Sequence, residues 1–224
     1  MLTTHVVPTR FSEKVVLKII LLASGILSSL YYVFINIIVP MRFEGYSLVT
    51  QTVSELSAIG APTRPLWVAI ATLYILLFAV FGWGVWQSSA GNRPLRMVAR
   101  LIFAYCVINI YWPPMHLRGT EPSLTDTLHI VWSAIAVLFM MAMMGFGAAA
   151  LGKRFRIFTI ASIALHVVFG ILTGIEAPNI ATNLPTPLIG VWERINIGIF
   201  MLWVIVLAIA LLRKENRSHM TCPV

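Results

Sequence analysis

The sequence predicts an all-α polytopic membrane protein, in which residues 1–224 form one bundle of six transmembrane helices with both termini in the cytoplasm. Three observations lead to this fold class: the composition, the recurrence of long apolar runs, and the one-sided placement of basic residues. The chain is 59% hydrophobic and only 11% charged, which is too little charge for the surface of a soluble domain of this length.

Six apolar runs account for the expected helices. They cover approximately residues 15–39, 66–86, 97–112, 124–151, 155–175 and 189–212. About 18 apolar residues span a bilayer as a helix, and in hydrocarbon the backbone must satisfy its own hydrogen bonds. The third run is short and is stopped by Pro113 and Pro114. The first run is too long for a signal peptide and lacks a small-residue cleavage site, so we expect it to be retained.

The basic residues predict the orientation. Of sixteen Lys and Arg residues, twelve lie near the two chain ends and in the second and fourth connections, which share one side of a six-span chain. The positive-inside rule places that side in the cytoplasm, with short tails 1–14 and 213–224. Topology and contact with anionic lipids then explain the net charge of +8, and no nucleic-acid partner is expected.

The strongly polar residues inside the runs fall mostly in the half that is expected to face outward. The inward half offers mainly hydroxyls and glycines. Polar residues of membrane helices face other helices rather than lipid. The asymmetry therefore predicts a polar pocket that opens to the outer leaflet. The outward residues are Asn36, Asn109, His129, Glu193, Arg194 and Asn196.

Two stretches resemble a known family. Residues 46–66 read YSLVTQTVSELSAIGAPTRPL and carry a Ser-Glu-Leu loop, and residues 190–212 read GVWERINIGIFMLWVIVLAIALL and begin the last run with Trp-Glu-Arg. With TDTLH between them, nearly the whole chain resembles the bacterial six-span family catalogued as domain of unknown function 998. The resemblance implies a multi-pass bacterial membrane protein and implies no reaction.

The segment TDTLHIVWSA places Asp126 and His129 on one face of a helix at the mouth of the fourth run. Ser123 and Asp126 fit a helix cap, which explains Asp126 without any catalytic role. The cap leaves His129 unexplained, and an ionisable residue within a span is a functional candidate by default. The catalytic hypothesis makes His129 a base and Asp126 the residue that orients it.

The same hypothesis takes Ser54 as a tentative nucleophile, with Thr52 as the other candidate hydroxyl of its loop. No G-x-S-x-G turn supports it. The preferred interpretation is a short loop helix in which Glu55 is solvated or paired to an arginine.

Glu193 and Arg194 begin the sixth run, and adjacent helical residues point about 100° apart, so they need not pair. Arg194 suits either an anionic head group or a structural partner such as Glu176, and both alternatives stay open. The predicted ligand-binding residues are Arg194, Glu193, Glu176, Asn109, Asn36, His116 and Glu55.

No metal or other cofactor is predicted, although a metal held by His116, Asp126 and His129 stays open, because no characteristic ligand spacing supports it. His166 is expected to hydrogen-bond between helices. Cys106 and Cys222 would lie in different environments, so no disulfide is expected.

Three functions fit these features. The leading hypothesis is a protein that binds a membrane lipid or small amphiphile in the outward pocket. The second is an intramembrane hydrolase of a lipid ester or amide, which requires a hydroxyl within hydrogen-bonding reach of His129. The third is a small transporter. The unbroken runs argue against it, because transporters commonly have helices interrupted by Gly or Pro at mid-membrane. The sequence does not indicate an oligomeric state.

Overall fold

The computed structural model describes residues 13–220 and the side chains of residues 13–217. Residues 1–12 and 221–224, including Cys222, lie outside the described residues. The described chain is helical and has no strand, although one isolated parallel bridge joins Ile59 and His116.

Six long helices carry the fold. They are α1 (Glu13–Ile38), α2 (Arg64–Gln87), α3 (Arg93–Ile108), α4 (Leu124–Ala150), α5 (Lys153–Glu176) and α7 (Ile189–Met220). Three short helices lie in connections: the 3-10 helices η1 (Pro40–Arg42) and η2 (Val53–Ser57), and α6 (Pro178–Ala181). All the long helices except α3 are long and apolar enough to cross a membrane, as expected for a polytopic membrane bundle.

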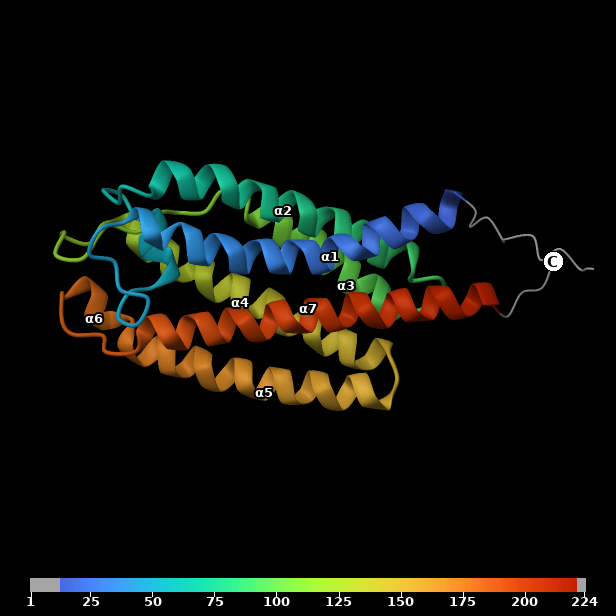
Figure 1. The fold of residues 1–224 in the computed structure, drawn as a ribbon. Coiled ribbons are helices and arrows are strands. Elements are labelled where there is room, and N and C mark those ends of the chain that lie inside the picture. Colours follow the sequence, from blue (N-terminus) through green and yellow to red (C-terminus); the bar gives the residue numbers. More distant parts are fainter. Residues whose placement is uncertain (1–12, 221–224) are drawn as a thin grey trace, which may run out of the picture.

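The long helices form a closed ring, because each packs on the next along the chain and α7 packs on α1. The longer connections 39–63, 109–123 and 177–188 lie together at one end, which we call the loop end (Figure 1). The short connections 88–92 and 151–152 and both ends of the described chain lie at the opposite end, the terminal end (Figure 1).

Two helix boundaries differ from expectation. The third run was predicted at 97–112, but α3 begins at Arg93, where the Asn92 side chain accepts a hydrogen bond from the Leu95 N–H, and ends at Ile108. Its 16 residues extend only about 24 Å. In the last run, α7 continues through most of the predicted tail 213–224 to Met220, and Lys18 of α1 pairs with Glu215 there at 2.9 Å.

The largest hydrophobic core cluster lies between the long helices. Phe78, Phe81, Phe200 and Trp203 are buried in it, and the Trp203 indole N–H donates to the Thr159 hydroxyl at 3.0 Å. Because α3 ends at Ile108, irregular chain takes its place in the loop-end half of the ring. The irregular segment 109–123 continues from α3 in that half, and such backbone is tolerated in a membrane bundle where it is buried or lines a cavity.

Candidate functional site

The loop end is held together by a buried ion pair. Glu55 of η2 is 0% exposed and accepts two hydrogen bonds from Arg118, at 2.6 Å from Nε and 3.0 Å from Nη2. The Thr52 N–H and hydroxyl also donate to this carboxylate, at 2.7 and 3.1 Å. Paired bonds from one guanidinium to one carboxylate are the strongest geometry such a pair can adopt. Of the two interpretations offered for Glu55, the structure has it paired to an arginine.

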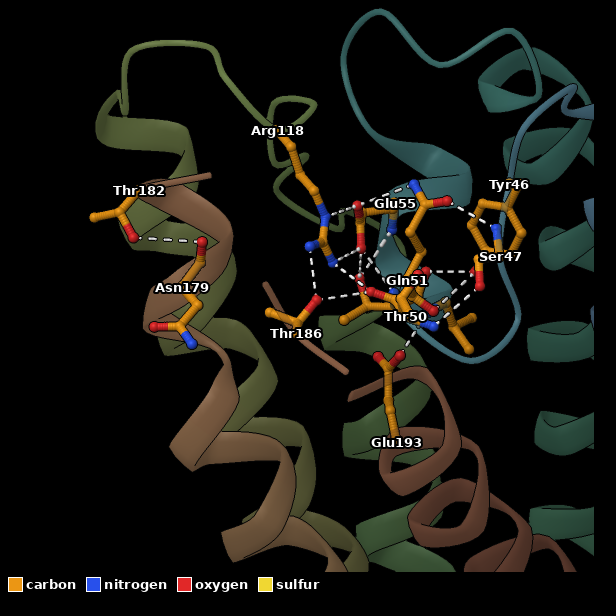
Figure 2. A network of polar contacts seen from close by, with 12 residues as sticks. Tyr46, Ser47, Thr50, Gln51, Glu55, Arg118, Asn179, Thr182, Thr186 and Glu193 are labelled. Carbon is orange, nitrogen blue, oxygen red and sulfur yellow. Dashed lines mark hydrogen bonds and ion pairs between the residues drawn. The ribbon is translucent and has the colours of Figure 1, made fainter. Parts of the chain in front are cut away.

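Arg118 also joins the three loop-end connections to one another. Its Nη1 donates to the Thr186 hydroxyl at 2.6 Å, and its Nη2 donates to the Thr50 carbonyl at 2.7 Å. Thr186 donates in turn to the same carbonyl at 2.8 Å. Figure 2 shows these contacts converging between segments that are far apart in sequence. We call Glu55, Arg118, Thr50, Thr52 and Thr186 the loop lock.

Arg194 fixes the 46–52 loop to α7 instead of facing a ligand. Its Nη1 donates to the carbonyls of Leu48, Gln51 and Gly190, each at 3.0 Å, and its Nη2 donates to the Tyr46 hydroxyl at 2.6 Å. Burial raises the pKa of Tyr46 to about 12, so the phenol stays protonated and can also donate to the Thr52 carbonyl.

Below the loop lock lies a partly open cavity of about 990 Å³. It reaches from the loop end into the middle of the bundle, and α2, α4, α5, α7 and the 109–123 segment all contribute to its wall. The polar residues of the wall include Ser54, Asn109, His116, Asp126, His129, His166 and Glu193. The apolar wall residues include Leu138 and Met141, which lie deeper along α4 than His129, and Val167 and Ile171 of α5. The cavity thus joins a polar end to an apolar body.

Asp126 does not orient His129, as the sequence had suggested. It caps α4 as expected, since Ser123 donates to it from both backbone and hydroxyl at 2.8 and 2.9 Å. Its remaining bonds go to His116, whose backbone N–H and ring Nδ1 lie 2.7 and 2.9 Å away. Helical side chains tilt toward the helix N-terminus, so a carboxylate in the first turn points up toward the 109–123 segment and away from the turn below.

His129 is oriented by the backbone instead. Its Nδ1 donates to the Pro113 carbonyl at 2.7 Å, and its ring packs edge-on against Trp112. Because Nδ1 carries the hydrogen, Nε2 is left as an acceptor. Among the described residues, no hydroxyl lies within hydrogen-bonding distance of the His129 ring, and Ser54 is bonded to no histidine, so the contacts that the serine–histidine–aspartate hypothesis requires are absent there.

The residues at the start of α7 diverge. Glu193 lines the main cavity and accepts one hydrogen bond, from the Val53 N–H at 2.5 Å, and Figure 2 shows it pointing from α7 toward the loop. Arg194 and Asn36 line a separate smaller pocket of about 230 Å³ beside α1. Glu193 therefore lines the same cavity as Asp126 and His129, whereas Arg194 faces the smaller pocket, because adjacent helical positions face different neighbours.

The remaining candidates have structural partners. Glu176 accepts from the Leu188 N–H and the Trp192 indole N–H, at 3.1 and 3.2 Å, and so does not pair with Arg194. The Asn109 side chain donates to the Tyr105 carbonyl of its own helix at 2.8 Å and lines the main cavity.

His166 bridges α5 and α7, as expected. Its Nδ1 donates to the Asn196 carbonyl at 3.2 Å, and the Asn196 side chain donates back to the His166 carbonyl. The residue is 0% exposed and lines the cavity, yet its Nε2 has no hydrogen-bond partner among the described residues. An unsatisfied buried acceptor is uncommon and calls for a donor.

The described residues contain no group of three His, Cys, Asp or Glu side chains placed to hold a metal ion. The three-ligand alternative of His116, Asp126 and His129 therefore has no geometric basis there, since His116 and Asp126 bond to each other while His129 bonds to Pro113.

Sequence reasoning missed the loop lock. Arg118 carried one available signal, because it is one of four basic residues predicted on a side otherwise poor in them. A basic residue on the side where the positive-inside rule disfavours it is expected to have a structural or binding partner nearby. Thr50 and Thr186 gave no such signal, since they contribute a backbone carbonyl and a hydroxyl that only the fold brings together.

Comparison with known families places the chain in one of them. A family profile described as "Protein of unknown function (DUF998)" matches residues 26–210, and the chain belongs to that family. No curated protein and no solved structure matches the chain.

Proposed function

We propose that this member of the DUF998 family binds one lipid or small amphiphile, with the head group at the loop end of the main cavity and the tail along its apolar body. The observation that carries the proposal is the joint lining of one cavity of about 990 Å³ by polar residues such as Asp126 and Glu193 and by apolar residues such as Leu138 and Ile171. Ligand cavities of this size are mostly apolar with a few fixed polar groups.

A lateral opening between α4 and α5 would admit such a ligand from the bilayer. Leu138 of α4 and Ile171 of α5 both line the cavity and are 64% and 58% exposed. The two helices meet at their connection at the terminal end and diverge toward the loop end (Figure 1). A tail lying between them would contact lipid on one side and the cavity wall on the other.

Two glycine variants test the proposal. Gly174 lines the cavity and Gly145 does not, both are exposed helical residues, and a Cβ at either position would meet nothing within 4 Å. We expect Gly174→Phe to fill the cavity and to remove a lipid that native mass spectrometry detects on the wild-type protein. Gly145→Phe should retain that lipid.

Equal retention of the lipid by both variants would contradict the proposal, as would a wild-type protein that carries no lipid after purification in mild detergent. Size-exclusion profiles of both variants establish that each remains folded.

A second candidate function is hydrolysis of a lipid ester or amide, and the Asp126–His116 bond favours it. Asp126 holds Nδ1 of His116, so Nε2 is the free nitrogen of a ring that lines the cavity. His116 would remove a proton from water as the water oxygen attacks the substrate carbonyl. The proton would then pass to the departing alcohol or amine as the ester or amide bond breaks.

Mass spectrometry of lipids incubated with the purified protein tests this candidate. If hydrolysis is the function, free fatty acid appears with the wild-type protein and with His129→Phe and is absent with His116→Ala. Loss of product in His129→Phe alone would restore His129 as the base, and intact lipid with every protein would leave binding as the function.

The same proposal includes the topology. We infer that α3, continued by residues 109–123, completes a sixth span, that the loop end faces outward, and that both termini are cytoplasmic in a bacterial inner membrane. The one-sided basic residues support this orientation. In a background without Cys106 and Cys222, Ala90→Cys should react with an impermeant thiol reagent only from the cytoplasmic side. Thr182→Cys should react only from outside, and the reverse pattern would invert the topology.

A further inference from the structure

We infer, resting on the proposed function, that the cavity selects amphiphiles whose head group is a protonated amine. The groups that would recognise it are the Glu193 carboxylate, the unpartnered Nε2 of His166, and an aromatic wall formed by Tyr32, Trp67 and Tyr74, all of which line the main cavity.

Glu193 is a carboxyl group that forms no ion pair with another described residue. Within the described residues, no basic nitrogen lies within 4.0 Å of the Glu193 carboxylate oxygens, which is the limit for an ion pair. The one hydrogen bond that this carboxylate accepts comes from the Val53 N–H. The neighbouring Arg194 turns to the 46–52 loop and bonds to backbone carbonyls there. A carboxylate removed from water is costly unless it is paired, so a cationic ligand is the partner that this position lacks.

His166 requires a hydrogen-bond donor. Its Nδ1 donates to the Asn196 carbonyl, so the buried Nε2 presents a lone pair. Glu193 and Asn196 are three residues apart on α7 and share a face, which places the carboxylate near the His166–Asn196 pair. The N–H groups of an ammonium satisfy both acceptors, whereas a carboxylate or phosphate head group offers no such donor.

The aromatic wall favours the same charge. Tyr32 lies edge-on to Trp67 and Tyr74, with ring centroids 6.2 and 4.9 Å away. Tyr32 and Trp67 pack on a cluster formed by Ile35, Val39 and Leu56. Leu56 belongs to η2, whose Val53 N–H donates to Glu193, so the wall and the carboxylate adjoin. Aromatic faces attract cations, and they do so more strongly where water is excluded.

The other charged side chains of the cavity do not reverse this preference. Asp126 is anionic and already accepts from His116 and Ser123. Arg64 is the basic residue of the wall, and its Nη1 donates to the Ser57 carbonyl.

Three ligands with one tail provide the test: octylamine, octanol and octanoate, titrated against the full-length protein in nanodiscs of zwitterionic phosphatidylcholine. Trp67 and Trp112 line the cavity, so tryptophan fluorescence reports occupancy. Empty nanodiscs correct for partitioning into lipid. We expect octylamine to bind about tenfold more tightly than octanol, and octanoate to bind most weakly.

The variants isolate the carboxylate. Glu193→Gln should bring octylamine to about the affinity of octanol and leave octanol binding unchanged, while Glu193→Asp should keep a reduced preference. Glu176→Gln is the matched control, because Glu176 is a carboxylate near the loop end that is not among the cavity residues, and it should retain the wild-type ratio.

The failures are distinguishable. If none of the three ligands binds saturably, the proposed function fails, and this inference fails with it. Saturable binding in which octanol or octanoate equals octylamine would overturn only the head-group inference. An unchanged preference in Glu193→Gln would do the same. If Glu193→Gln does not fold, the wild-type ratio and Glu193→Asp still decide.

Discussion

Two glutamates at the loop end meet the same short helix in opposite ways. Glu55 lies within η2 and is surrounded by donors from Arg118 and Thr52, whereas Glu193 reaches η2 from α7 and accepts a single bond from Val53. The Glu55 carboxylate has its hydrogen-bonding capacity filled by protein donors, whereas the Glu193 carboxylate can accept further hydrogen bonds. The difference separates a part of the molecule built for rigidity from a part left able to bind.

The cavity lies directly beneath the lock, and the two share η2. Ser54 lines the cavity while Glu55 is buried in the lock. A rigid loop lock holds the polar groups of the neighbouring cavity in fixed positions, so these groups do not need to hydrogen-bond to one another. The comparison therefore predicts that changes in the lock cost stability and that changes in the cavity alter binding.

Breaking the lock should have the largest effect. Arg118→Ala leaves Glu55 buried without its cation, and we expect the free energy of unfolding to fall by about 3–5 kcal/mol. Denaturant titration in detergent micelles measures it. Arg42→Ala is the control, because Arg42 is an exposed arginine at the same end. A similar small effect in both variants would show that the lock carries no stability.

A wedge between α7 and the 46–52 loop should have the next largest effect. A Cβ built at Gly190 would overlap the carbonyl oxygens of Leu48 and Gln51, which also accept from Arg194. We expect Gly190→Ala to destabilise the protein by about 1–3 kcal/mol, as overpacking does. Gly198→Ala, on the same helix with open space around its Cβ position, should change stability little. Equal melting temperatures for the two variants would refute the wedge.

Asp126 lines the cavity and also caps α4, so its replacement should have an intermediate effect on stability. Asp126→Asn weakens the cap of α4 and the bond to His116, and we expect a loss of about 1 kcal/mol in the free energy of unfolding. Ser123→Ala removes the same cap from its other side, so the double variant should lose less than the sum of the two. Strict additivity would mean that the cap and the Asp126 bonds act separately.

Glu193→Gln should have the smallest effect on stability. Its carboxylate has no ion pair to lose, so we expect a change within about 0.5 kcal/mol or a slight gain. The same denaturant titration measures it beside Arg118→Ala. A loss as large as that of Arg118→Ala would erase the contrast between the two glutamates.

The sequence by itself determined the helices, because hydrocarbon forces a long apolar run to satisfy its backbone internally. Five expected spans agree with the structure to within a few residues at most boundaries. The Ser123–Asp126 cap could be predicted because its two residues are only three positions apart in the sequence. Glu193, His129 and Asn109, which the sequence predicted to face the bundle interior, line the cavity, since helical polar positions turn away from lipid.

Only the tertiary structure decided which polar groups meet. Asp126 bonds to His116 rather than to His129, Arg194 holds a loop rather than a head group, and Arg118 finds Glu55 from a different connection. Each of these contacts joins segments whose relative placement depends on how the helices close into a ring and where α3 stops. Local periodicity fixes the face on which a side chain lies, but its partner is set by packing between elements distant in the chain.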